Sequence, residues 1–89
     1  MTETEIYLWT DPRGLAYVSL RFRAGHWQVE WGHRDPPGGD KYLERGKHET
    51  SVKDDAVRQM LDQVRAMSEE PGEAKRVEAE LRDALAAVG

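Results

Sequence analysis

The feature that most restricts the fold is the stretch from Ala16 to Trp31, AYVSLRFRAGHWQVEW, in which apolar and polar residues alternate on both sides of an Ala-Gly pair. Such alternation is typical of half-buried β-strands, and a two-residue connection that contains glycine is typical of a tight hairpin. If the Ala-Gly pair forms this turn, Arg23 pairs with His26. The pleat then puts three apolar pairs on one face of the sheet: Phe22 with Trp27, Leu20 with Val29, and Val18 with Trp31.

A second turn is predicted at Asp11–Gly14, DPRG, where Asp, Pro and Gly occupy the positions that a type I turn favours. Pairing Asp11 with Leu15 gives a hairpin whose apolar face coincides with the face above, and it places Glu5 beside Arg21 as a cross-strand charge pair. The two turns together predict a three-stranded antiparallel meander over about residues 5–32. Its core face comprises Ile6, Leu8, Ala16, Val18, Leu20, Phe22, Trp27, Val29 and Trp31.

The C-terminal half changes to helical periodicity. A loop is predicted over residues 33–50, starting with HRDPPGGDK, and it allows a short fourth strand that begins at Tyr42 and Leu43. Ser51 is expected to cap a helix over about residues 52–67, and Pro71-Gly72 separates it from a second helix over about residues 72–88. The apolar stripes are Val52, Ala56, Val57, Met60, Leu61, Val64 and Met67, and then Ala74, Val77, Leu81, Ala84, Leu85 and Val88. The sequence therefore predicts one α+β domain over residues 1–89, with two layers and an antiparallel helix pair on one sheet face.

Composition excludes several classes of function. Seventeen acidic residues against thirteen basic ones give a net charge of −4, which argues against general DNA binding and mildly favours a basic protein partner. There is no cysteine, so disulfides and thiol chemistry are excluded. The start, MTETEIYLW, lacks the basic and apolar regions of a signal peptide, and no apolar run approaches the ~20 residues that span a bilayer. We therefore expect a cytoplasmic protein, and the excess of Arg over Lys suggests a GC-rich bacterial genome.

The sheet face away from the helices is the predicted binding surface. The predicted register places Trp9 opposite Tyr17 there, together with Tyr7, Arg21 and Arg23. Tyr, Trp and Arg dominate the hot spots of protein interfaces. These five residues are therefore the predicted partner-binding site of a small acidic, non-catalytic module of the adaptor, inhibitor or immunity type.

Three alternatives explain the same aromatic residues. The segment 33–46 could fold over them as a structural cover, or a second copy of the chain could bind there in a symmetric homodimer. Single-stranded nucleic acid could stack its bases on the aromatic rings, with arginines on the phosphates. Glu5 and Glu30 lie on the same predicted face and argue against the nucleic-acid alternative.

No pattern in the sequence predicts catalysis, a cofactor or a metal site. Ser19 is predicted on the open sheet face, the other two serines lie at helix ends, and none has an obvious general base as its partner. His26 and His33 lie at opposite ends of the third strand, roughly 23 Å apart, so they cannot share one metal ion. We expect no catalytic residue, no cofactor and no bound metal.

Overall fold

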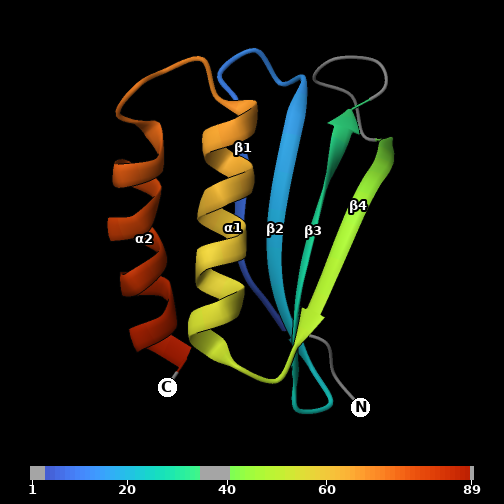
Figure 1. The fold of residues 1–89 in the computed structure, drawn as a ribbon, viewed down its shortest axis with the longest axis vertical. Helices are drawn as coiled ribbons and strands as arrows, with labels where there is room; N and C mark the ends of the chain where they lie inside the picture. The colour runs from blue at the N-terminus through green and yellow to red at the C-terminus, as the bar shows by residue number, and fades with distance from the viewer. Residues whose placement is uncertain (1–3, 35–40, 89) are drawn as a thin grey trace.

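The protein is an antiparallel sheet with two helices packed on one of its faces (Figure 1). The structure is a computed structural model that describes residues 4–34 and 41–88, apart from the side chains of residues 42, 44 and 88. In these residues the elements are β1 Thr4–Thr10, β2 Ala16–Arg23, β3 His26–Arg34, β4 Tyr42–Thr50, α1 Lys53–Met67 and α2 Glu73–Val88. The strand order is β1-β2-β3-β4. The predicted two-layer α+β fold is confirmed.

The β2–β3 hairpin has the predicted turn and the predicted register. Ala24 and Gly25 have φ angles of 52° and 81°, and positive values at both central residues define the type I′ turn that suits the twist of a hairpin. Arg23 pairs with His26, and the apolar pairs follow as expected. Val18, Leu20 and Val29 are completely buried, whereas Trp27 and Trp31 are only half-buried, against expectation. Next to the β2–β3 turn, the rings of Phe22 and Trp27 pack with centroids 4.7 Å apart.

The β1–β2 connection is one residue longer than predicted. Asp11 pairs with Ala16 instead of Leu15, and its backbone N–H donates to the Ala16 carbonyl oxygen at 3.2 Å. The carboxylate of Asp11 is the reason, because its Oδ1 accepts hydrogen bonds from the backbone N–H groups of Leu15 at 2.6 Å and Ala16 at 3.1 Å. Gly14 has the expected left-handed conformation, with φ of 69°.

This longer turn shifts most of β1 by one residue relative to the prediction. Trp9 lies opposite Val18, and Leu8 lies opposite Ser19. Trp9 is therefore in the core, with 2% of its surface exposed, and Leu8 is 40% exposed on the other face. A β-bulge between Glu5 and Tyr7 restores the predicted register, so Glu5 does lie opposite Arg21. The predicted register of β1 is therefore correct at Glu5, before the bulge, and wrong by one residue from Tyr7 onward.

β4 is a full edge strand of nine residues, where a loop with at most a short strand was predicted. It pairs with β3 along its length and has a register shift next to Gly32. Gly32 and Gly46 have no side chain, and this allows β3 and β4 to pack closely together. A Cβ atom on Gly32 would collide with the Leu43 carbonyl oxygen, and a Cβ atom on Gly46 would lie 2.5 Å from the Trp31 ring. Residues 35–40, the centre of the predicted loop, lie outside the described residues.

The helices complete the core from one side. α1 contacts β2, β3 and β4, whereas α2 contacts β1 and α1. Their buried residues fall on the predicted stripes: Ala56, Met60, Leu61 and Val64 on α1, and Val77 and Leu81 on α2. Val52 is exposed instead of buried, because it is the N-cap residue of α1 in place of Ser51. Neither helix in the described part is long and apolar enough to cross a membrane.

Candidate functional site: the open sheet face

The open face is the side of the sheet that faces away from both helices. Tyr17, Arg21 and Arg23 lie on it, as predicted, because the register of β2 against β3 is the predicted one. Tyr7 and Trp9 do not lie there, because the shift of β1 turns them to the helix side. The predicted aromatic cluster of Tyr7, Trp9 and Tyr17 is therefore not formed.

Tyr7 and Trp9 dock α2 onto β1. The indole Nε1 of Trp9 donates to Glu73 Oε2 at 3.1 Å, and the hydroxyl of Tyr7 donates to Glu80 Oε1 at 2.9 Å. Arg76 joins the two carboxylates: its Nε donates to Glu73 Oε1 at 2.6 Å and its Nη1 pairs with Glu80. The hydrogen bonds from Arg76 and Trp9 lower the pKa of Glu73. Burial and the bond to Glu80 raise the pKa of Tyr7 to about 12.

Tyr17 belongs to a polar network in the middle of the open face. Its ring lies against the backbone of Gly32, where an added Cβ would be 3.0 Å from the Tyr17 Cε1 atom, and only 3% of the residue is exposed. Its hydroxyl donates to Glu30 Oε1 at 2.9 Å. Arg21 Nη1 lies 3.8 Å from the other oxygen of Glu30. Tyr17 therefore positions Glu30, and its ring is not an exposed contact surface.

Ser19 lies next to this network at the centre of the sheet. It is completely buried, and its Oγ makes no hydrogen bond within the described chain. Leu8 on β1 and Glu30 on β3 lie opposite it and flank it. A buried hydroxyl without a hydrogen-bond partner costs about 1–3 kcal/mol of folding stability. The alternation in the sequence gave the face of Ser19 correctly, but no sequence signal indicated its burial.

An open depression of about 280 Å³ lies over Ser19. We call it the Ser19 hollow, and its walls are Glu5, Leu8, Tyr17, Ser19, Arg21 and Glu30. Glu5 is exposed and has no hydrogen-bond or ion-pair partner within residues 4–34 and 41–88. The two carboxylates of the hollow outnumber its single guanidinium, so its lining is acidic. This constellation was not predicted as a unit, because it depends on the corrected position of Leu8.

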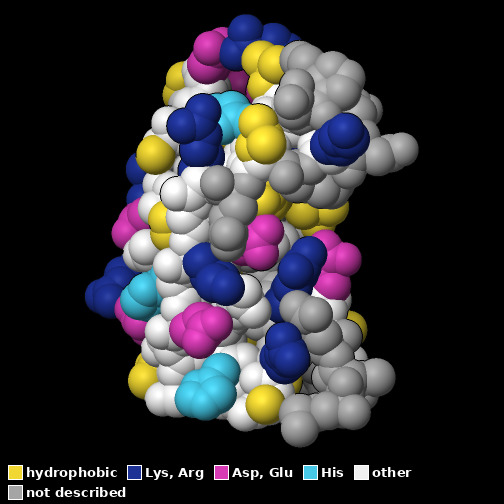
Figure 2. Space-filling model, turned by 90° about the vertical axis from the view of Figure 1, so that its right-hand side faces the viewer, with side chains coloured by type: hydrophobic (Ala, Val, Ile, Leu, Met, Phe, Trp, Pro, Cys, Tyr) yellow, Lys and Arg dark blue, Asp and Glu magenta, His cyan; other side chains and the backbone are white. Residues whose placement is uncertain are grey.

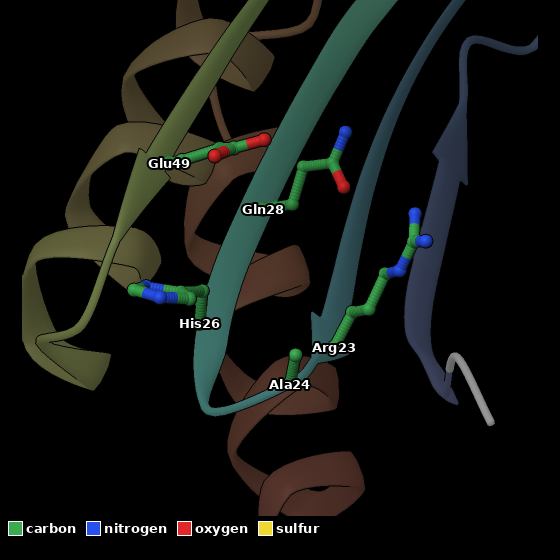
Figure 3. A pocket seen from close by; sticks show the side chains of 5 residues that line it. All are labelled: Arg23, Ala24, His26, Gln28 and Glu49. Atoms are coloured by element: carbon green, nitrogen blue, oxygen red, sulfur yellow. The ribbon is translucent and has the colours of Figure 1, made fainter. Parts of the chain in front are cut away.

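A second depression, of about 220 Å³, lies at the β2–β3 turn and is lined by Arg23, Ala24, His26, Gln28 and Glu49 (Figure 3). Figure 3 shows this end of the open face with the helices behind the sheet. The Arg23 side chain extends toward β1 and the His26 ring toward β4, so the two groups diverge. A binding site needs polar groups that converge on a ligand, and this depression lacks them.

The side of the molecule away from the helices is strongly charged. Figure 2 shows acidic and basic side chains interspersed on it, with small hydrophobic areas between them. On the open face, Lys47 of β4 lies opposite Glu30, and Glu49 lies opposite Gln28. A surface of this kind favours partners that match its charges at particular positions.

One further polar cluster lies on the helix side, between β4 and α1. His48 Nε2 lies 3.0 Å from Asp55 Oδ2, and Arg58 donates to Asp55 Oδ1 at 2.7 Å. The bonds from His48 and Arg58 lower the pKa of Asp55 to about 2. This cluster fixes the start of α1 against the sheet. In the described part of the chain, no three acidic or histidine side chains are arranged to hold a metal ion.

Comparison of the chain with protein-family models, with curated proteins and with solved structures finds no match. The functional argument therefore rests on the geometry of the open face.

Proposed function

We propose that this chain is a non-catalytic protein-binding module of the adaptor, inhibitor or immunity type in a bacterial cytoplasm, and that it binds its partner through the open face. The observation that carries the proposal is the Ser19 hollow. A buried hydroxyl that has no hydrogen-bond partner in the described part of the chain lies under a charged rim, on the face opposite both described helices. A partner that covers this hollow can supply the missing hydrogen bond and pair with the rim charges.

The surroundings of Ser19 support binding over catalysis. A nucleophilic serine needs a general base at hydrogen-bond distance from its hydroxyl. Within the described residues the Ser19 Oγ has no such neighbour, and the nearby Glu30 is engaged by Tyr17.

The corrected positions of Tyr7 and Trp9 weaken the nucleic-acid alternative. Base stacking needs exposed ring faces. Trp9 is 2% exposed on the helix side, and Tyr17 is 3% exposed on the open face. A homodimer would use the same open face as a protein partner, so oligomeric state is measured in the same experiment.

The experiment is affinity capture from native lysate with tagged wild type and two double variants. Arg23→Glu/Lys47→Glu reverses two exposed charges on the open face, and Lys75→Glu/Arg82→Glu reverses two exposed charges on α2 as the matched control. We expect a protein that binds wild type and the α2 variant, with capture reduced at least tenfold by the open-face variant. Circular dichroism confirms that all three are folded.

Three outcomes would contradict the proposal. Equal capture of the same partner by both variants would exclude the open face. Capture that disappears after nuclease treatment would indicate nucleic acid, which should also be released steeply by salt. Light scattering that shows a wild-type dimer converted to monomer by the open-face variant would assign the surface to self-association.

A further inference from the structure

We infer that the Ser19 hollow receives a lysine side chain of the protein partner. This inference rests on the proposed function and specifies the chemistry of its contact. The hollow combines a buried hydroxyl that has no hydrogen-bond partner among the described residues, the exposed carboxylate of Glu5 and an apolar wall within one depression.

The charges of the hollow favour a cation. Glu5 and Glu30 face a single basic residue, Arg21. Glu5 is exposed opposite Arg21, and within residues 4–34 and 41–88 its carboxylate makes no hydrogen bond or ion pair. The whole chain carries a net charge of −4, which adds a long-range attraction for a basic partner.

The acceptors of the hollow match the donors of an ammonium group. A lysine ammonium carries three N–H donors and no acceptor. Ser19 Oγ and the carboxylates of Glu5 and Glu30 supply three acceptors from three adjacent strands. The contact of Arg21 with Glu30, at 3.8 Å, is longer than a hydrogen bond, so an arriving ammonium can compete for that carboxylate.

Access to Ser19 requires one movement. Its hydroxyl is covered by the surrounding side chains, among which Arg21 has a side chain that is 35% exposed. A long, partly exposed arginine side chain can turn away from the sheet without loss of core packing. We expect the incoming ammonium to displace Arg21 together with the contacts that this side chain makes.

The size and the apolar wall of the hollow suit one side chain. Pockets for small molecules and cofactors usually measure about 300–1,000 Å³, and the hollow, with about 280 Å³, lies just below this range. Leu8, which is 40% exposed, offers apolar surface for the methylene groups of lysine.

The test is an NMR titration of ¹⁵N-labelled protein with N-acetyl-lysine methylamide. N-acetyl-norleucine methylamide, which has an apolar side chain in place of the ammonium, is the control probe. We expect saturable shifts of the amide signals of Glu5, Leu8, Ser19 and Glu30 with the lysine probe, and at least fivefold weaker binding of the norleucine probe. Glu5→Gln should weaken the lysine probe at least threefold. Glu49→Gln, which removes an exposed charge of the same face outside the hollow, should leave its affinity unchanged.

Three results would overturn the inference: no saturable shifts at the hollow, equal binding of both probes, or equal effects of Glu5→Gln and Glu49→Gln. The titration needs no protein partner, so its result can be distinguished from the result of the affinity capture that tests the proposed function. Capture of a partner through the open face without binding of the lysine probe would reject the lysine contact alone. Binding of the probe without open-face capture would reject the protein partner as the source of the amine.

Discussion

The indole Nε1 of Trp9 donates a buried hydrogen bond of 3.1 Å to the carboxylate of Glu73, 64 residues further along the chain. Trp9 lies on the edge strand β1, and Glu73 is the first residue of α2. The bond fixes the start of α2 on the sheet and keeps the largest aromatic ring of β1 on the core side.

Trp9→Ala should lower the free energy of unfolding by about 3–5 kcal/mol, because it leaves a cavity in the core. Trp9→Phe, which mainly removes the bond to Glu73, should lower it by about 1–2 kcal/mol. Leu8→Ala should cost less than about 1 kcal/mol, because Leu8 is 40% exposed. Urea denaturation measures all three, and a larger cost for Leu8→Ala than for Trp9→Ala would reverse the assignment of faces.

Ser19→Ala should leave the free energy of unfolding unchanged or raise it by up to about 1 kcal/mol, because it removes a buried hydroxyl that has no partner. Ser68→Ala serves as the comparison. Ser68 Oγ accepts a hydrogen bond from the Glu70 backbone N–H at 3.0 Å, so its loss should cost about 0.5–1 kcal/mol. A cost above about 1 kcal/mol for Ser19→Ala would mean that its hydroxyl is bonded in solution.

Gly32→Ala should lower the free energy of unfolding by about 1–3 kcal/mol or more, because the new methyl group would collide with the Leu43 carbonyl oxygen and separate β3 from β4. Gly72→Ala should change it by no more than about 0.5 kcal/mol, since no atom lies within 4 Å of the added Cβ. Thermal unfolding followed by circular dichroism compares the two. Similar melting temperatures for both variants would show that β4 is not held closely against β3.

Asp55 should make stability depend on pH in the acid range. Its pKa is lowered from 3.8 to about 2 in the folded chain, chiefly by the hydrogen bond with His48. Between these values the unfolded chain binds the proton first, so the contribution of Asp55 is present above about pH 4 and is lost as the pH falls toward 2. Melting temperatures measured from pH 6 to pH 2 should fall less steeply for Asp55→Asn than for wild type. Parallel curves would contradict the role of this carboxylate.

The parts of the fold that depend on local sequence were predictable. The Ala24-Gly25 turn fixes its own geometry, and the apolar alternation on both sides of it agrees with only one register. The helix stripes follow in the same way from spacing alone.

The parts that depend on contacts between distant residues, or on one unexpected side-chain bond, were not predictable. The carboxylate of Asp11 lengthens the first turn by one residue, and that single bond pattern reverses the faces of Leu8 and Trp9. The fourth strand was predicted as a possible short strand from Tyr42, but its full length was not predicted, because its sequence, YLERGKHET, has no apolar alternation. Its pairing depends on Gly32, which lets the backbone at Leu43 approach, and on Gly46, which leaves room for the Trp31 ring.

The candidate site was predictable in its location but not in its chemistry. Tyr17 and Arg21 were placed on the correct face by the register of β2 and β3. Glu5 and Glu30 were also placed on this face, but the burial of Ser19 beside Leu8 was not predicted, because the sequence pattern gave the face of Leu8 wrongly.

The bulge at Ile6 separates β1 into two segments that can change independently. Glu5, before the bulge, belongs to the surface that meets a partner, whereas Trp9, after it, belongs to the core. Regular pairing of every residue of β1, Ile6 included, would bring both segments into a single phase, so that either the rim carboxylate or the buried indole would point to the wrong side. Deletion of Ile6 would instead keep Glu5 opposite Arg21 and Tyr7 opposite Leu20. The bulge therefore lets one short strand contribute to two opposite surfaces.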